Sequence, residues 1–287
     1  MKVSNPVAVV TGASRGAGRG IAVALGCHGC TVYVTGRSER TGDANLPGTI
    51  YETANAVTAA GGTGIAVKVD HAEDREVEAL FAQIRRDHGR LDILVNNACA
   101  LHDALTAPGN FWEKPLAIVD MLDVGLRSSF VSSYYAMPLM IDRPGSLVVF
   151  TSASGAVHYA FGPVYGAHKA GMDKFAADMA VDLKPFGVAA VSIWMGTLLT
   201  DRLRMVIASD PVKYQHLEAQ SESPELTGHL IWALFDDPNL ADISGQTVIG
   251  AEMAVKYGIR DSSGRQPASC RETHKLEPRV QYPLVIR

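Results

Sequence analysis

Seven short apolar runs, separated by stretches with helical periodicity, occupy most of the chain. The runs lack the polar–apolar alternation of a sheet with one solvated face, so we expect strands that are buried on both faces. Strands and helices that alternate in this way are typical of a parallel, doubly wound sheet with right-handed crossovers. The predicted strands are Val7–Thr11, Thr31–Thr35, Gly64–Val69, Ile93–Asn96, Ser146–Ser152, Val188–Trp194 and Gln246–Ile249. The predicted helices lie near Gly16–His28, Ile50–Ala60, Asp74–His88, Lys114–Met140, Gly162–Lys184 and Glu225–Phe235.

The length of the chain and its lack of repeats or low-complexity linkers predict one domain. A chain of 287 residues can bury a full core as a single α/β domain. We predict an α/β fold of the Rossmann type, a doubly wound parallel seven-stranded sheet with helices on both faces. The domain should span residues 1–260 and include a substrate flap at 197–221. Residues 261–287 form a tail that we expect to pack on the domain or on a neighbouring subunit.

Composition and charge argue against several classes of partner. The net charge is −4 and no cluster of Lys and Arg appears, which argues against a nucleic-acid partner. No apolar run reaches the length needed to span a bilayer, and Pro6–Val10 is too short for the core of a signal peptide. We therefore expect a cytoplasmic protein. Cys27 and Cys30 have the spacing of a redox or zinc half-site; without a second Cys/His pair we interpret them as small apolar fillers and predict no metal site.

A glycine-rich loop follows the first predicted strand directly and opens the first predicted helix. It reads Thr11-Gly12-Ala13-Ser14-Arg15-Gly16-Ala17-Gly18. Glycines at such a place permit a tight turn and a close approach of the backbone to a pyrophosphate at the helix N-terminus. A purely structural glycine turn is the alternative, but the position after the first strand favours a dinucleotide site. The predicted cofactor contacts in this loop are Gly12, Ser14, Arg15, Gly16 and Gly18.

The end of the second strand discriminates between the two nicotinamide dinucleotides. A site for NAD usually has an acid there, which bonds the ribose 2′-hydroxyl. Here the strand ends Thr35-Gly36-Arg37-Ser38, with no acid at that position. Arg37 and Arg15 can clamp a 2′-phosphate, with Ser38 as a further donor. We predict NADP(H) over NAD(H); the alternative is a pair of solvated arginines.

The next two strands also end in polar residues that suit a nucleotide. Asp70 ends the third strand, where its carboxylate can accept a hydrogen bond from the adenine amino group. Asn96, Asn97 and Ala98 end the fourth. Taken alone, both groups are better explained as turn or cap residues. Beside the glycine loop, we predict Asp70, Asn96 and Ala98 as cofactor contacts.

Tyr165 and Lys169 stand four residues apart in Tyr-Gly-Ala-His-Lys, and Ser152 lies thirteen residues upstream. On a helix, the i, i+4 spacing places the phenol and the ammonium on one face. An unperturbed Tyr titrates near pH ~10, too high for efficient proton transfer at neutral pH, and a neighbouring cation lowers that pKa. Ser152 can hold a carbonyl oxygen while Tyr165 gives or takes its proton. This chemistry accompanies hydride transfer at carbon.

The chain resembles a classical short-chain dehydrogenase/reductase over roughly residues 5–250. The matching residues are Thr11–Gly18, Asp70, Asn96-Asn97-Ala98, Ser152 and Tyr165-x-x-x-Lys169. Other segments resemble the subgroup around dehydrogenase/reductase SDR family member 1: Gly125-Leu126-Arg127, Leu46–Ile50 and Met253–Gly264. The resemblance implies NADP(H)-dependent oxidoreduction of a carbonyl or a secondary alcohol, with steroids and xenobiotic ketones as candidate substrates.

The resemblance also implies a role for each matching residue. Tyr165 would be the acid/base, Lys169 would lower its pKa and bond the nicotinamide ribose, and Ser152 would orient the substrate oxygen. Asn96 would support the sheet and the cofactor near the adenine-ribose side. The remaining implied cofactor contacts, near the nicotinamide amide, are Gly196 and Thr200.

Four positions depart from the usual pattern of this family. Cys99 stands where Asn-Asn-Ala-Gly has its last glycine, Met195 replaces a proline and is expected to loosen its turn, and His168 replaces a small residue. We interpret His168 as packed or solvated. The usual catalytic Asn, which holds a water that links the lysine to bulk solvent, falls at Gly125. The proton relay should therefore use backbone carbonyls and water, or be slower.

The expected substrate is a medium-sized apolar carbonyl or alcohol. The pocket should be lined by the flap and by Ala156–Phe161, Cys99–His102 and Met195–Leu199, which are largely apolar and aromatic. Gly125 leaves one alternative, a nucleotide-binding protein of the same fold with weak or no catalysis that serves as a redox sensor or scaffold.

Assembly into a homodimer or a homotetramer is expected from two of the predicted helices. Lys114–Met140 and Gly162–Lys184 could pair across a two-fold axis, and such pairing is compatible with enzyme function.

Overall fold

The computed structural model describes residues 4–287 and contains one parallel sheet with the strand order β3-β2-β1-β4-β5-β6-β7. Every pairing in it is parallel. The predicted seven-stranded, doubly wound fold is confirmed, and each strand lies within one residue of its predicted bounds. The strands are β1 (Val7–Val10), β2 (Thr31–Gly36), β3 (Thr63–Lys68), β4 (Ile93–Asn96), β5 (Leu147–Ser152), β6 (Ala189–Trp194) and β7 (Thr247–Ile249).

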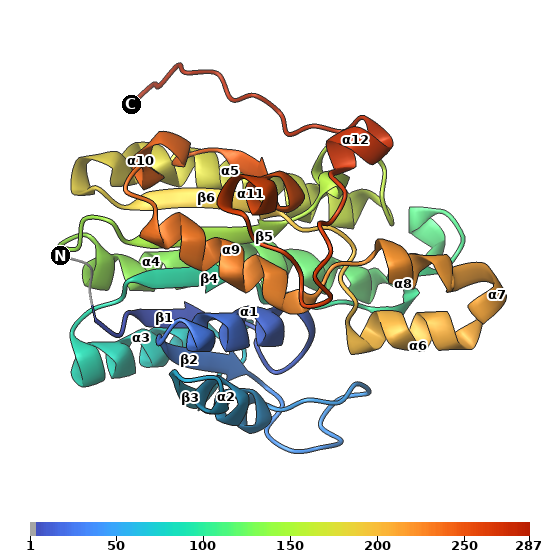
Figure 1. Ribbon diagram of the computed structural model, residues 1–287, viewed down its shortest axis with the longest axis horizontal. Coiled ribbons are helices and arrows are strands. Elements are labelled where there is room, and N and C mark those ends of the chain that lie inside the picture. The colour runs from blue at the N-terminus through green and yellow to red at the C-terminus, as the bar shows by residue number, and fades with distance from the viewer. Residues whose placement is uncertain (1–3) are drawn as a thin grey trace.

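Helices cover both faces of the sheet (Figure 1). One face packs against α1 (Gly16–Cys27), α2 (Ile50–Ala59) and α9 (Pro224–Asp236). The other packs against α3 (Asp74–His88), α4 (Ser128–Met140) and α5 (Pro163–Leu183). The side chains of successive strand residues pack on opposite faces of the sheet, as those of Val149 and Phe150 do. Because each fully buried aliphatic or aromatic side chain contributes about 1.5–3 kcal/mol, the mostly apolar strands stabilise this three-layer arrangement. The edge strand β3 departs from our expectation, since none of its residues is buried.

The strand order reverses between β1 and β4, which pair directly. The helices that follow these two strands pack on opposite faces of the sheet. A crevice therefore opens at their carboxyl ends, and this is where doubly wound sheets bind their ligands. The glycine loop lies at this point.

The predicted helix Lys114–Met140 is not one continuous α-helix. The structure has a 3₁₀ turn η3 (Leu116–Val119), a π-helix η4 (Leu122–Arg127) and then α4. Gly125 in η4 packs against a side chain of α5, and the Ser129 hydroxyl donates to the Gly125 carbonyl at 2.6 Å. Such hydroxyl-to-backbone bonds compete with regular helix geometry, and π-turns are a common result at functional sites.

The flap predicted at residues 197–221 contains three helices that lie beyond the carboxyl ends of the strands (Figure 1). They are α6 (Asp201–Ser209), α7 (Pro211–Tyr214) and α8 (His216–Gln220). The start of the tail holds the end of the flap, since the Arg265 guanidinium donates to the carbonyls of Ala219 and Ser221 at 2.6 and 3.0 Å. Arg265 is in turn paired with the buried Asp261. The first residues of the tail are thus part of the flap's support.

Several short helices were not predicted from the sequence. They are η1 (Asp103–Thr106), η2 (Phe111–Glu113), η5 (Ser154–Ala156), η6 (Lys184–Phe186), α10 (Leu240–Ile243), α11 (Gly250–Tyr257) and α12 (Cys270–His274). None of the helices within residues 4–287 is long and apolar enough to cross a membrane.

Candidate active site

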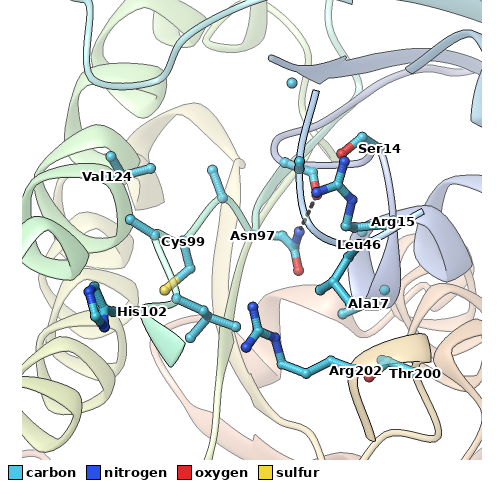
Figure 2. A pocket seen from close by; sticks show the side chains of 18 of the residues that line it. Ser14, Arg15, Ala17, Leu46, Asn97, Cys99, His102, Val124, Thr200 and Arg202 are labelled. Carbon is cyan, nitrogen blue, oxygen red and sulfur yellow. Dashed lines mark hydrogen bonds between the residues drawn. The ribbon is translucent and has the colours of Figure 1, made fainter. Parts of the chain in front are cut away.

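A cavity of about 1000 Å³ lies between the glycine loop, the carboxyl ends of the strands and the flap (Figure 2). Most of the predicted site residues line it together, although they come from distant parts of the sequence. These residues are Gly12, Ser14, Arg15, Gly16, Gly18, Arg37, Ser38, Asp70, Ala98, Tyr165, Lys169 and Thr200. The other three predicted residues do not line it: Ser152 and Asn96 are fully buried, and Gly196 is exposed.

The glycine loop forms a cradle of bare backbone that side chains would fill. Gly12 and Gly16 have φ of +64° and +56°, a conformation that favours glycine. A Cβ at Gly12 would lie 2.7 Å from Ala98 Cα, and one at Gly18 would lie 2.4 Å from the Gly12 carbonyl oxygen. The loop leads into the N-terminus of α1, where amide groups and the helix dipole favour an anion. These features fit the pyrophosphate of a dinucleotide.

Asn97 holds this loop in place, a role that the sequence did not reveal. Its side-chain amide donates to the carbonyls of Thr11 and Gly12 at 2.8 and 3.2 Å. The Thr11 hydroxyl accepts from the backbone N–H groups of Asn97 and Ala98. Asn96, which we predicted instead, is fully buried and donates to the Ser133 hydroxyl of α4 at 3.0 Å. Adjacent residues at a strand end point to opposite sides, so only Asn97 faces the cavity.

Cations surround the end of the cavity beside β2 and β3. Arg15 donates to the Ser38 hydroxyl at 2.6 Å and to the Gly48 carbonyl at 2.8 Å. Arg37 lies 3.6 Å from Asp70 and its side chain is exposed. Burial lowers the pKa of Arg15, and the charges of Arg37 and Arg202 lower it further. Arg15 and Arg37 thus place two guanidinium groups in one region, which favours an anionic ligand there.

His71 is a polar residue of this region that sequence reasoning missed. Its Nε2 lies 2.8 Å from the Thr35 hydroxyl, and the residue is buried although it lines the cavity. Burial lowers its pKa to about 4, so the imidazole is neutral at physiological pH. Its Nδ1 has no hydrogen-bond partner among the described residues. The only sequence signal was its position after Asp70.

Tyr165 and Lys169 lie on one face of α5, as their spacing predicted. The Lys169 ammonium is 5.7 Å from the centre of the Tyr165 ring and donates to the Thr151 carbonyl at 3.2 Å. The Ser152 hydroxyl is fully buried and donates to the Lys169 carbonyl at 3.1 Å. Ser152 and Tyr165 therefore both lie next to Lys169. To hold a substrate oxygen, the Ser152 hydroxyl must exchange this backbone bond.

The pKa of Tyr165 is shifted in the direction opposite to our expectation. Burial raises it to about 12, with a further contribution from Cys99. Burial also lowers the pKa of Lys169, against the pull of Cys99 and Asp173. The ammonium sits over the ring and bonds Thr151 instead of the phenol oxygen, so desolvation dominates. In this geometry the Tyr165 phenol is protonated at neutral pH.

Another part of the cavity wall combines apolar side chains with the charged pair Asp103 and Arg202. The apolar side chains that line it are Ala100, Leu101, Val124, Leu198, Met205 and Val206. Arg202 of α6 pairs with Asp103 at 2.6 Å and so links the flap to η1. The predicted segment Ala156–Phe161 does not line the cavity. Tyr159 is 77% exposed, and Phe161 makes an edge contact with the Tyr165 ring.

The turn after β6 is held by a residue from the far end of the flap. The Gly196 N–H donates to Glu222 Oε1 at 3.0 Å, and the backbone of Glu222 bonds Thr197 and Leu199. Burial raises the pKa of Glu222 to about 7, while the bond from Gly196 opposes the shift. We predicted that Met195 loosens this turn, but the hydrogen bonds from Glu222 hold the turn in place. It places Met195 and Thr200 on the cavity wall.

Comparison with known proteins identifies the family of this arrangement. The sequence profile of the family described as short chain dehydrogenase matches residues 6–210. The chain is 39% identical to dehydrogenase/reductase SDR family member 1 of Mus musculus over 270 residues, 90% of this chain and 84% of the relative. The Homo sapiens protein of the same name is also 39% identical, over 92% of this chain and 85% of the relative.

Solved structures agree with these sequence matches. A short chain dehydrogenase from Mycobacterium thermoresistibile superposes with a TM-score of 0.74 at 25% identity, over 90% of this chain and 89% of that one. The expected resemblance to the subgroup around dehydrogenase/reductase SDR family member 1 is confirmed. The chain belongs to the short-chain dehydrogenase/reductase family of oxidoreductases.

Proposed function

We propose that the protein is an NADP(H)-dependent oxidoreductase that transfers hydride between nicotinamide and the carbonyl or secondary alcohol of a medium-sized apolar substrate. The observation that carries the proposal is the position of Tyr165, over Lys169 and on the wall of a cavity that also contains the glycine cradle. The experiment that tests it is turnover of an apolar ketone with NADPH in the wild type and in Tyr165→Phe.

The chain's own residues supply binding and proton transfer. Gly12, Gly16 and Gly18 would hold the pyrophosphate, and Lys169 and Thr200 would bind the nicotinamide half. When bound, the nicotinamide supplies or accepts the hydride at the substrate carbon. Tyr165, with its raised pKa, gives its proton to the carbonyl oxygen during reduction. The flap covers the cavity and limits the access of water.

The preference for NADP(H) rests on the cations at the end of β2. Arg37 stands at the position where an NAD site has an acid, and it is free to leave its exposed contact with Asp70. Arg15 is fixed by Ser38 and Gly48, so its guanidinium is held ready for a phosphate. A 2′-phosphate satisfies both groups, whereas a 2′-hydroxyl leaves their charge uncompensated.

The substrate class follows from the apolar part of the lining. Leu101, Val124, Leu198 and Met205 offer apolar contacts in the same cavity as Tyr165. Arg202 is already neutralised by Asp103, so it gives little attraction for a charged acid. These contacts support an apolar ketone or secondary alcohol as the substrate.

Assembly and location complete the proposal. On α4, Phe130 and Tyr134 are 50% and 65% exposed, and Phe130 touches Phe175 of α5. The two exposed aromatic rings on one helix support a homodimer or homotetramer in which a second copy covers them. Analytical ultracentrifugation of the wild type and Tyr134→Glu tests it: dissociation of the variant supports this face, and an unchanged mass contradicts it. The location of the protein in the cytoplasm stays a prediction, which cell fractionation can check.

The second candidate is a nucleotide-binding redox sensor or scaffold with weak or no catalysis. The glycine at position 125 favours it, because the family's usual Asn side chain is missing there. Binding of NADPH without turnover of any carbonyl or alcohol would support this alternative. Turnover that Tyr165→Phe abolishes would exclude it.

A further inference from the structure

His168, near the start of α5, contacts two other departures from the family pattern, Cys99 and Gly125. His168 is only 1% exposed, and its ring packs against Gly125 of η4. A Cβ at Gly125 would lie 2.7 Å from the imidazole Nε2 and 2.9 Å from Cε1. Glycine at 125 is therefore required by the ring, and the imidazole fills the space that a side chain at 125 would take. His168 is thus packed and not solvated, and it packs against the position that lacks the family's usual Asn.

The two ring nitrogens of His168 face different surroundings. Nδ1 lies 3.8 Å from the sulfur of Cys99, a residue that lines the cavity. Nε2 is buried and has no hydrogen-bond partner within residues 4–287. Burial, with the charge of Lys169, lowers the pKa of His168 to about 2. The ring is thus neutral, with one N–H donor and one acceptor. Buried polar atoms of this kind are normally satisfied by ordered water.

Lys169, the next residue, needs a path to solvent if it takes part in proton transfer. Its side chain is almost wholly buried, and its ammonium donates to the Thr151 carbonyl. Each reduction consumes one proton, which must enter from bulk water. No side chain at Gly125 can hold a water for this purpose, whereas the imidazole in the same space can.

We propose that His168 is a positioning residue that binds a buried water at Nε2 and so connects Lys169 to solvent; this rests on the proposed oxidoreductase function. During reduction, Tyr165 gives its proton to the substrate oxygen, and Lys169 returns a proton to the phenolate. The water gives a proton to Lys169 and takes one from bulk solvent, so it is unchanged at the end. His168 stays neutral throughout. In oxidation the protons move in the reverse order.

Four variants separate this role from packing alone. His168→Gln keeps a polar group near the position of Nε2, and His168→Leu fills similar space without one. The double variant Gly125→Asn/His168→Ala moves the polar side chain from α5 to η4. In Gly125→Asn alone, the new side chain should collide with the His168 ring. His274→Leu, at an exposed histidine of α12, is the control.

The variants should differ in kcat and should bind NADPH with the affinity of the wild type. His168→Leu should lower kcat about 10- to 100-fold, the size of one impaired proton-transfer step, and should increase the solvent isotope effect. His168→Gln and Gly125→Asn/His168→Ala should recover most of the rate, while Gly125→Asn alone should not. If His168→Leu matches the wild type in kcat and isotope effect, the inference is wrong.

A crystal structure of the wild-type protein gives a readout without turnover. It should show an ordered water about 2.7–3.2 Å from Nε2, and this water should be missing in His168→Leu. An Nε2 without any water would overturn the inference whatever the activity. If the water is present but neither the wild type nor Gly125→Asn/His168→Ala turns over any carbonyl, the proposed function has failed instead.

Discussion

Gly155 leaves the space in which the ring of Tyr165 lies. A Cβ at position 155 would stand 2.5 Å from Cε1 and 3.0 Å from Cδ1 of that ring. Gly155 belongs to η5, the turn between β5 and α5. The position of the phenol is therefore set by the strand-to-helix connection as well as by the helix that carries it.

Gly155→Ala should displace the ring of Tyr165 and lower kcat. A displacement of about 1 Å typically costs about 100-fold in rate, and the variant should keep the circular dichroism spectrum of the wild type. Gly166→Ala is a matched control one residue from Tyr165, because its Cβ would make an ordinary 3.5 Å contact with the Gly155 carbonyl. Equal kcat values for the two variants would show that the contact does not position the phenol.

Arg37→Asp should change the cofactor preference from NADPH toward NADH. The variant loses a cation and places an acid where a ribose 2′-hydroxyl can bind it. Charge-assisted bonds contribute about 1.5–3 kcal/mol, so kcat/KM for NADPH should fall about 10- to 100-fold. Arg40→Asp makes the same charge change at an exposed site outside the cavity. An equal loss in both variants, or none in Arg37→Asp, would contradict the assignment.

His71 should make the protein less stable in acid. Its pKa is about 4 in the folded protein, below the unfolded value of about 6.5. The stabilisation is full above pH ~6.5 and is lost as the pH falls toward 4, by up to about 3 kcal/mol. His71→Gln removes the titration and can keep the bond to Thr35. Urea unfolding at pH 7 and pH 4.5 should show a smaller difference for this variant; an unchanged difference would refute the role of His71.

Glu222 should have the opposite effect on stability. Its pKa is raised to about 7 in the folded protein, so its contribution is full below the unfolded value of about 4.3 and is lost as the pH rises through 7. Glu222→Gln keeps an acceptor for the Gly196 N–H and should be more stable than the wild type at pH 8 but not at pH 5. Glu272→Gln, at an exposed acid, is the control. A variant that is less stable than the wild type at pH 8 would show that the carboxylate is needed there.

The strands and the glycine loop could be predicted because their signals are local. An apolar run, or glycines directly after a strand, needs no knowledge of distant residues. The π-helix at Gly125 was not predicted, and its contact with His168 joins residues more than forty positions apart, which no local pattern reveals. The helix α11 was also missed, since its eight residues are too few for a clear periodicity.

Most of the predicted site residues line the cavity. Of the two neighbours Asn96 and Asn97, only Asn97 bonds the glycine loop, and no local pattern decides which of them turns toward the cavity. The Gly196 N–H donates to Glu222, and no motif in the sequence connects these two positions. The lowered pKa expected for Tyr165 failed because sequence reasoning counted the nearby cation and not the burial of both groups.

The most direct test of the central claim is NADPH oxidation by the purified protein with a panel of apolar ketones, with Tyr165→Phe as the blank. The account predicts turnover in the wild type and a loss of at least about 100-fold in kcat in the variant, the size expected for removal of a general acid, at unchanged affinity for NADPH. Equal rates in the two proteins, or NADPH binding without turnover of any ketone, would contradict it.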